Sequence, residues 1–379
     1  MKETTSPQEH INKIKEFRQA IYDQGLTRRR DAQFELMDAL LQNPKIKSFP
    51  ELTLSPVFRR RWSSAYKAIE VGEQNRAWMT RYLSQQVPEG VQVFALDETV
   101  WPHPQAHTLE GMLYERSPTK SVKRYGIVRG HVYSILAWVP EAEGSWSPPV
   151  DSRRVSAETD AVQTGMQQID ALVEARRAAG QTGLVVIATD GRYSSHVCNR
   201  AIDERDGVAK VGRMRCDRTL YRAPGPYQGK GRPRKHGAPF RFKDPATWDV
   251  PAEDVTFAHH KFGQVRLRRW KGLHAQKDTE VSFSVIRCET HLERERPPDP
   301  LWIELVGFDD FDARTVWGWF QHRWPIEAQN RFRKQYLNWV LPKFQQAQHC
   351  DAYCVRAVLL DDPGRSRLLA ALSDTRLDR

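Results

Sequence analysis

The sequence has little of what export, membrane insertion or disulfide cross-linking requires. Only five of its 379 residues are cysteines, and Cys350 and Cys354 alone lie close together. No stretch approaches 18 consecutive apolar residues, and the first 17 residues contain no apolar core of a signal peptide. We therefore expect a cytoplasmic protein without disulfides or membrane spans. A zinc site formed by His349, Cys350 and Cys354 would lack a fourth ligand, so none is expected there.

Acidic residues are also fewer than basic ones. The chain has 58 Lys and Arg against 47 Asp and Glu, a formal net charge of +11 and a pI near 9.5. This balance favours a polyanionic partner, and the 12 tryptophans with Arg-rich segments suit nucleic acid better than a membrane surface. The length allows two or three domains with a sizeable core.

Glycine is scarce in the N-terminal quarter, where Gly25 and Gly72 are the only two before residue 88. Apolar residues recur there at three- and four-residue spacing, so residues 8–87 are predicted to be helical. Basic clusters at 28–30 and 59–61 are candidates for phosphate contacts, because guanidinium groups match phosphate oxygens. A solvated basic surface is the alternative.

Two short apolar, β-branched-rich runs each end on an aspartate. VQVFALDET (91–99) leads to Asp97, and GLVVIATDGRYSS (183–195) leads to Asp190. Both runs are typical of buried strands. Aspartates at strand ends are also common as helix caps or turn formers, so neither residue alone identifies a site.

The remaining pattern around these aspartates alternates strands and helices. His103 and His107 follow Asp97 in an irregular stretch, where isolated histidines usually contact neither metal nor DNA. A mixed-sheet α/β domain is expected. Its further elements would be a hairpin around Arg129-Gly130 (125–140), a helix over 156–179, a helix over 194–205 and a strand over 207–214.

A third acidic residue lies in the stretch FQHRWPIEAQNRFRKQ, residues 320–335. Pro325 suits the first turn of a helix, which puts Glu327 near that helix's N-terminus. A helix running past Lys334 would align Glu327 with Asn330 or Arg331 and with Lys334. That face could present one acid to a metal ion and cations to phosphates, although a salt-bridged surface helix gives the same pattern.

These residues resemble the insertion-sequence DDE transposases, whose catalytic domain has an RNase H-like fold. One group of that family carries the signature Tyr-x2-Arg-x3-Glu-x6-Lys, and Phe320, Arg323, Glu327 and Lys334 reproduce its spacing. Phe320 departs from the signature, so no polar role is carried to it. The resemblance covers roughly residues 91–338 and, more weakly, the helical stretch before them.

The resemblance implies a metal-dependent DNA strand-transfer enzyme. Asp97, Asp190 and Glu327 would be both the catalytic residues and the ligands of two Mg²⁺ ions, for which Mn²⁺ can substitute. Arg323 and Lys334, with Arg331, would contact DNA phosphates. The expected partners are double-stranded DNA, as transposon ends and target, and a second copy of the chain in the synaptic complex. In a prokaryotic cell such a protein would be associated with the nucleoid when bound.

The 136 residues between Asp190 and Glu327 exceed what a bare RNase H-like domain needs, which predicts an insertion over 217–300. Residues 213–243 contain ten Lys or Arg and one acid. KGRPRKHG (230–237) is similar to the motif by which AT-hook segments place arginines in a narrow minor groove. Its candidate DNA-binding residues are Lys230, Arg232, Arg234 and Lys235. A coincidental basic loop is the alternative.

The rest of this region alternates apolar and polar residues, which predicts strands over 254–273 and 280–291. Trp270 is a candidate for stacking on an unpaired base, with Arg268 and Arg269 beside it, and core packing is the alternative. A strand over 299–308 and a helix capped by Asp312 lead to Pro325. Trp317, Phe320 and Trp324 have helical spacing and are expected in the core.

The sequence thus predicts an N-terminal helical domain that binds DNA ends (1–90), an RNase H-like domain in two parts (91–216 and 301–340) and a basic β-rich insertion between them (217–300). A helical tail follows (341–379). Two other functions fit the same residues. One is a transposase-derived DNA-binding protein that no longer cuts, and the other is an RNase H-like nuclease of hybrids or junctions.

Overall fold

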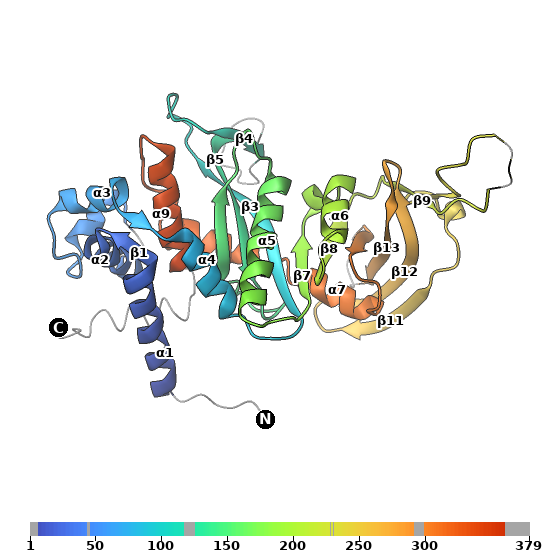
Figure 1. Ribbon diagram of the computed structural model, residues 1–379, viewed down its shortest axis with the longest axis horizontal. Coiled ribbons are helices and arrows are strands. Elements are labelled where there is room, and N and C mark those ends of the chain that lie inside the picture. Colours follow the sequence, from blue (N-terminus) through green and yellow to red (C-terminus); the bar gives the residue numbers. More distant parts are fainter. Residues whose placement is uncertain are drawn as a thin grey trace.

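The structure is a computed structural model that describes residues 7–43, 46–116, 126–227, 229, 231–291 and 299–360. Helices gather at one end and a long twisted sheet runs from the centre to the other end (Figure 1). The helical pattern predicted for residues 8–87 is confirmed. The elements are α1 (Pro7–Ala20), the π-helical turn η1 (Ile21–Gly25), β1 (Leu26–Arg28), α2 (Arg30–Gln42), the 3-10 helix η2 (Phe49–Leu54), α3 (Trp62–Glu70), β2 (Glu73–Gln74) and α4 (Arg76–Gln85).

The central part of the sheet has the order β6-β5-β3-β7-β8. Strand β3 pairs antiparallel with β5 and parallel with β7, and β7 pairs parallel with β8. This mixed arrangement is consistent with an RNase H-like domain. The bounds are β3 (Gln92–Pro102), β4 (Leu113–Arg116), β5 (Ile127–Trp138), β6 (Pro149–Arg154), β7 (Val185–Thr189) and β8 (Val208–Met214).

Helices cover both faces of these strands. In β7, Val185 and Ile187 pack with the residues of α5 (Ala161–Ala178) and α6 (His196–Asp203), whereas Val186 and Ala188 pack with those of α7 (Ala313–Gln321). Because alternate residues face opposite sides of a strand, one apolar run supplies two cores. Ile326 of α8 (Pro325–Gln335) packs with residues of β3 and β5 on the α7 side.

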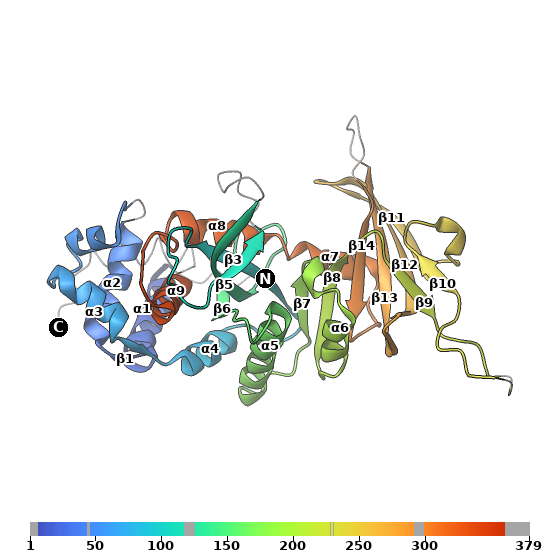
Figure 2. The ribbon, with the colours of Figure 1, turned by 90° about the horizontal axis from the view of Figure 1, so that it is seen from above.

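The sheet continues without a break into the region between the second and third acids. Strand β14 (Leu301–Val306) pairs antiparallel with β8, and β13 (Asp278–His291) pairs with β14. The remaining strands carry the same sheet outward (Figure 2). They are β9 (Thr219–Arg222), β10 (Pro239–Arg241), β11 (Glu253–His259) and β12 (Gly263–Ala275), with the 3-10 helix η4 (Pro245–Thr247).

The predicted hairpin around Arg129-Gly130 is wrong. Both residues lie inside the single strand β5, which pairs with β3 from Gly130 opposite Pro102 to Trp138 opposite Phe94. A Cβ at Gly130 would lie 2.1 Å from the carbonyl oxygen of Trp101. The glycine therefore permits two strands to approach closely, and it forms no turn.

The last described helix, α9 (Ala347–Leu359), connects the helical end to the sheet. The buried Arg356 donates a hydrogen bond of 2.8 Å to the carbonyl of Ala68 and another to the side chain of Gln33. At the other side of α9, Asp351 accepts a 2.9 Å hydrogen bond from Tyr133 of β5. Of the helical tail predicted over 341–379, residues 361–379 lie outside the described residues. In the described part of the chain no helix is long and apolar enough to cross a membrane.

Candidate active site

The first candidate acid, Asp97, lies in the middle strand of the RNase H-like order. It shares a face of β3 with Ala95, which packs in the same core as Ile326 of α8. Asn330 of α8 donates a 3.3 Å hydrogen bond from Nδ2 to Oδ2 of Asp97. Asp97 therefore faces the helix that carries Glu327.

The second acid follows the neighbouring strand. Strands β3 and β7 run parallel with Leu96 opposite Thr189, so Asp97 and Asp190 come next at the same edge. Asp190 accepts a 2.8 Å hydrogen bond from the backbone N–H of Arg192 and begins the 3-10 helix η3 (Gly191–Tyr193). Asp190 therefore also acts as a helix cap, which was the alternative role for an aspartate at a strand end. Its Oδ1 atom fixes the turn, and this turn positions its second carboxylate oxygen.

The third acid is in the first turn of α8, which begins at Pro325 as predicted. Asp312 caps the preceding α7 by accepting from the N–H groups of Arg314 and Thr315, also as predicted. Trp317 is buried but Trp324 is 46% exposed, so the core prediction for Trp324 is wrong. Trp324 stands at the break between the two helices, where the Arg323 guanidinium lies 4.0 Å from its ring centre.

The three acids influence one another electrostatically. Burial raises the pKa of Asp97 to about 6, and the negative charges of Asp190 and Glu327 add to the rise while Arg323 opposes it. Like charges held together cost free energy, because each carboxylate disfavours ionisation of the next. Acids held near one another in this way, with the cation Arg323 paired to Glu327, are typical of a site that receives a cation.

Basic groups of the signature border these acids. Arg323 donates from Nη1 to Oε1 of Glu327 at 2.8 Å, and only 8% of Arg323 is exposed. Burial and the nearby Arg333 lower the pKa of Lys334 to about 8, while the charge of Asp97 acts in the opposite direction. Arg331 is exposed on the outer side of α8, so Asn330 and not Arg331 completes the inward face.

Divalent cations of the magnesium type prefer carboxylate oxygens, and this site offers three. The described groups whose potential ligand atoms all lie within 4.8 Å of one another are His103–His131–Cys350 and Glu143–His259–His260. The three acids are not gathered this closely in the described structure, and Arg323 holds Glu327. The donor set fits a two-metal site by its chemistry, because such sites use carboxylate oxygens.

Sequence reasoning missed the side chains behind the acids. Glu98 points away from Asp97 to the other face of β3, where it pairs with Arg192 at 3.3 Å and accepts a hydrogen bond from Tyr193. Lys210 of β8 donates a 2.6 Å hydrogen bond to the carbonyl of Tyr193. These contacts fix η3, and with it Asp190, against β3 and β8. The sequence offers one hint, the acid pair Asp97-Glu98, whose members must face opposite ways in a strand.

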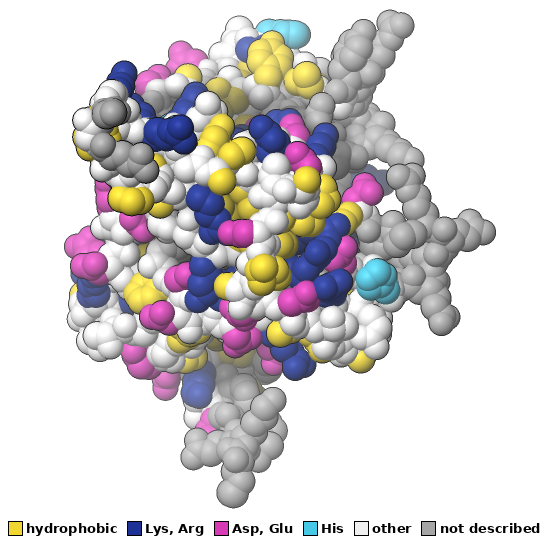
Figure 3. All heavy atoms as spheres, turned by 90° about the vertical axis from the view of Figure 1, so that its right-hand side faces the viewer, with side chains coloured by type: hydrophobic (Ala, Val, Ile, Leu, Met, Phe, Trp, Pro, Cys, Tyr) yellow, Lys and Arg dark blue, Asp and Glu magenta, His cyan; other side chains and the backbone are white. Residues whose placement is uncertain are grey.

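The basic loop lies far from the acids. Residues 223–238 connect β9 to β10 at the outer end of the sheet, where Arg232, Arg234 and Lys235 are exposed. Lys230 lies outside the described residues. Strand β9 is five strand spacings from β7, roughly 24 Å. Figure 3 shows this end of the molecule, where Lys and Arg side chains alternate with acidic ones.

The structure corrects the roles expected for residues 268–270. Trp270 is 1% exposed, packs against Phe240 and Trp302 at ring distances of 5.2 and 5.7 Å, and donates from Nε1 to a backbone carbonyl at 2.9 Å. Arg269 is fully buried and paired with two acids, and Arg268 is paired with Glu289 at 2.9 Å. Trp270 and Arg269 thus belong to the core and leave no surface for a base or a phosphate.

Comparison with known proteins agrees with this geometry. Residues 22–276 match the family described as DDE superfamily endonuclease. The matched residues include Asp97 and Asp190, whereas Glu327 and the spaced signature lie beyond them. A comparison with curated protein sequences gives no match. Since the match spans well over half of the chain, the protein belongs to the DDE superfamily endonuclease family.

Proposed function

We propose that the protein is a DNA transposase that cuts at transposon ends and joins them to target DNA. The observation that supports this proposal is that Asp97 and Asp190 come at the same level of neighbouring parallel strands, with Glu327 near enough for its charge to raise the pKa of Asp97. An endonuclease of the same family that only cuts would need the same acids, so the joining step rests on the resemblance around Glu327.

The three carboxylates would hold two Mg²⁺ ions, or Mn²⁺ in their place. When bound, the metal supplies the Lewis acidity that activates a water or a DNA 3′-hydroxyl and stabilises the leaving oxygen. Asp97 and Asp190 lie on neighbouring strands and provide fixed ligands. Glu327 lies on a helix and is paired with Arg323, so binding would exchange this ion pair for a metal contact.

The released Arg323 would then be free to contact phosphate. Its guanidinium is positioned by the Trp324 ring and lies beside the carboxylates. Lys334 would add a point charge from the same face of α8. Arg331, exposed one turn before the end of the helix, would contact the DNA backbone further from the cut.

DNA binding would extend over two other surfaces. Four basic residues and one acid line a hollow between α2 and α3, namely Arg29, Arg30, Arg60, Lys67 and Asp31, which pairs with Arg60. The excess of cations supports a role of the N-terminal helices in binding DNA ends. The loop with Arg232, Arg234 and Lys235 offers a second basic surface at the outer end of the sheet. Joining two ends to one target requires two active sites, so we expect a homodimer on DNA.

The test is strand cleavage of a DNA that carries both flanking regions of this gene. Wild-type protein is compared with Asp190→Asn, Glu327→Gln and the control Asp310→Asn, which changes an exposed acid before α7. Each is incubated with Mg²⁺, Mn²⁺ or EDTA. Metal-dependent cuts at the element ends, lost in the first two variants and kept in the third, are the expected result. Joined products in the same reactions would support transposition.

Two outcomes would contradict the proposal. Tight, salt-sensitive binding of both ends without cutting by folded wild-type protein would identify a DNA-binding relative. Metal-dependent cutting confined to RNA–DNA hybrids or junctions would identify an RNase H-like nuclease.

Replacing Arg232, Arg234 and Lys235 by alanine tests whether the outer loop contacts DNA. The logarithm of the binding constant falls linearly with the logarithm of the salt concentration, and each lost phosphate contact should reduce the steepness of this line by about 0.9.

A further inference from the structure

A buried cluster of two histidines and a cysteine joins three distant parts of the chain. His103 follows β3, His131 lies in β5 and Cys350 lies in the first turns of α9. Their exposed fractions are 7%, 0% and 0%. The site is separate from the three acids, and nothing in the proposed cleavage reaction uses it.

The potential ligand atoms are already close together. All three lie within 4.8 Å of one another, and Nε2 of His103 is 4.0 Å from Sγ of Cys350. In a tetrahedral zinc site, nitrogen and sulfur ligands are about 3.6 Å apart and two nitrogens about 3.3 Å apart, from the usual bond lengths. Side-chain shifts of about 1 Å would reach that geometry.

His131 has the arrangement of a metal ligand. Its Nε2 lies 2.8 Å from the carbonyl oxygen of Glu110, and because a carbonyl only accepts, Nε2 carries the proton. The lone pair is then on Nδ1, which is buried without a hydrogen-bond partner in the described structure. A histidine that donates its other ring N–H to a carbonyl is typical of metal sites, since that bond fixes the tautomer.

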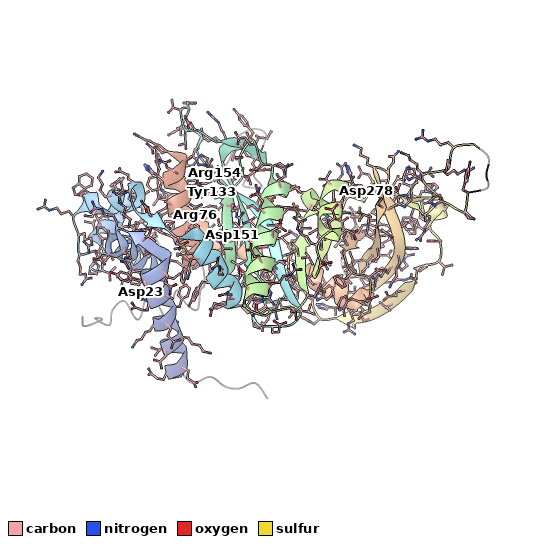
Figure 4. The ribbon with its side chains drawn as sticks, in the orientation of Figure 1. Asp23, Arg76, Tyr133, Asp151, Arg154 and Asp278 are labelled. Atoms are coloured by element: carbon pink, nitrogen blue, oxygen red, sulfur yellow. The ribbon has the colours of Figure 1, made fainter. Side chains whose placement is uncertain are left out.

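The surroundings hold the cluster in place without competing for it. Asp351, next to Cys350, accepts hydrogen bonds from Tyr133 and from Arg154 at 2.9 and 3.0 Å, so its carboxylate is already used. Tyr133 and Arg154 lie together beside α9 in Figure 4.

We propose that His103, His131 and Cys350 bind a zinc-class divalent cation that fastens α9 to the sheet. Two imidazoles and a thiolate favour zinc over magnesium, so this site and the three acids would take different metals. Binding forms one bond to each residue and releases the thiol proton of Cys350 to solvent. The fourth position of the tetrahedron would be held by water, as in zinc sites with three protein ligands. The missing fourth ligand that argues against a site at 349–354 weighs less here, because the three ligand atoms already lie together.

The test uses the full chain, purified without added zinc and then supplied with Zn²⁺ or Co²⁺. We expect one zinc per chain that survives gel filtration, and with Co²⁺ a thiolate-to-cobalt absorption band. Cys350→Ser should remove the band, and His131→Gln should lower the zinc content severalfold. The matched control is Cys354→Ser, which changes another buried cysteine of α9 that contacts Ser152 and lies outside the cluster.

Thermal unfolding supplies the second readout. A zinc chelator should lower the midpoint of wild-type protein and of Cys354→Ser, and leave that of Cys350→Ser unchanged. The proposal is overturned if wild-type protein gives no cobalt–thiolate band, or if the band persists in Cys350→Ser. Should Cys350→Ser not fold, His103→Asn, at the more exposed ligand, replaces it, and unchanged zinc affinity in that variant equally overturns the proposal. None of these measurements depends on DNA cleavage.

Discussion

Two aspartates in the two halves of the sheet experience opposite environments. Asp97, in the central half, has its pKa raised to about 6 by burial and by two other acids. Asp278, at the start of β13 in the outer half, has its pKa lowered to about 2 by hydrogen bonds from Arg200 and from backbone N–H groups. Figure 4 places Asp278 well away from the central strands. Asp278 is thus held by a cation, whereas Asp97 lies among other acids, an arrangement typical of a site that receives a cation.

The largest difference between the halves should appear in catalysis. Asp190→Asn removes a proposed metal ligand, which costs several kcal/mol of transition-state stabilisation and lowers cleavage by roughly a thousandfold or more. Asp278→Asn should cleave at the wild-type rate per folded molecule. Single-turnover cleavage with Mg²⁺ measures the rate of each variant. A comparable loss of rate in Asp278→Asn would show that the two halves of the sheet do not differ in their role in cleavage.

Breaking the charge pairing of the outer half should cost stability instead. Arg269→Ala leaves Glu253 and Asp309 without their buried partner, which should lower the free energy of unfolding by about 3 kcal/mol. Urea denaturation measures the change, with Arg232→Ala as the exposed control. A loss below about 1 kcal/mol for Arg269→Ala would mean that its pairs contribute little.

In the central half, removing a charge should stabilise the protein. Asp97 has a raised pKa in the folded state, so its contribution to stability is full below pH 3.8 and is lost as the pH rises through about 6. Asp97→Asn should therefore gain about 2 kcal/mol at pH 8 without divalent metal. This value is the free-energy cost of ionising a carboxyl whose pKa is raised to about 6, reduced because the site borders solvent.

The same variant should gain little near pH 4, where wild-type Asp97 is largely protonated. Denaturation of both proteins at pH 4 and pH 8 in EDTA gives the comparison. Added Mg²⁺ should stabilise only the wild type. A pH-independent difference would show that packing, not charge, distinguishes the two side chains.

The smallest expected effect is the stability of Asp278→Asn. A carboxylate with a lowered pKa contributes stability above its ordinary pKa near 3.8 and loses it as the pH falls through about 2. Because Arg200 is partly exposed, the loss at pH 7 should be about 1 kcal/mol. It should vanish near pH 2 in acid denaturation, opposite in sign to Asp97→Asn.

The sequence predicts the acids and helix starts of the central half better than the packing of the outer half. Asp97 and Asp190 end apolar runs, and Pro325 and Asp312 mark helix starts, so each signal is local. Trp270 gives no such signal, because Phe240 and Trp302 that bury it come from distant segments. An alternating strand shows that one face is covered, but not which partner covers it.

Two further failures have the same cause. The residues next to Gly130 in the sequence suggest a turn. In the structure a glycine is needed there because the backbone of Trp101, in the neighbouring strand, leaves no room for a Cβ. The cluster of His103, His131 and Cys350 has no spacing that a sequence pattern can detect, since its members are brought together only by β3, β5 and α9. Contacts across the sheet decide both features.

The uninterrupted sheet has a mechanical consequence. The ladders β3–β7, β7–β8, β8–β14 and β13–β14 contain no register shift, so the pairing is regular from the strands of Asp97 and Asp190 as far as β13. The next ladder, β12–β13, shifts register between Trp270 and Leu273 and again between Leu273 and Ala275. If the proposed function holds, the spacing of roughly 24 Å between β7 and β9 sets the smallest offset between the cut and a contact of the duplex with the basic loop. For a duplex lying along the strand order this offset is about seven base pairs. Footprinting on different sequences should return the same offset, set by the protein backbone and not by the DNA.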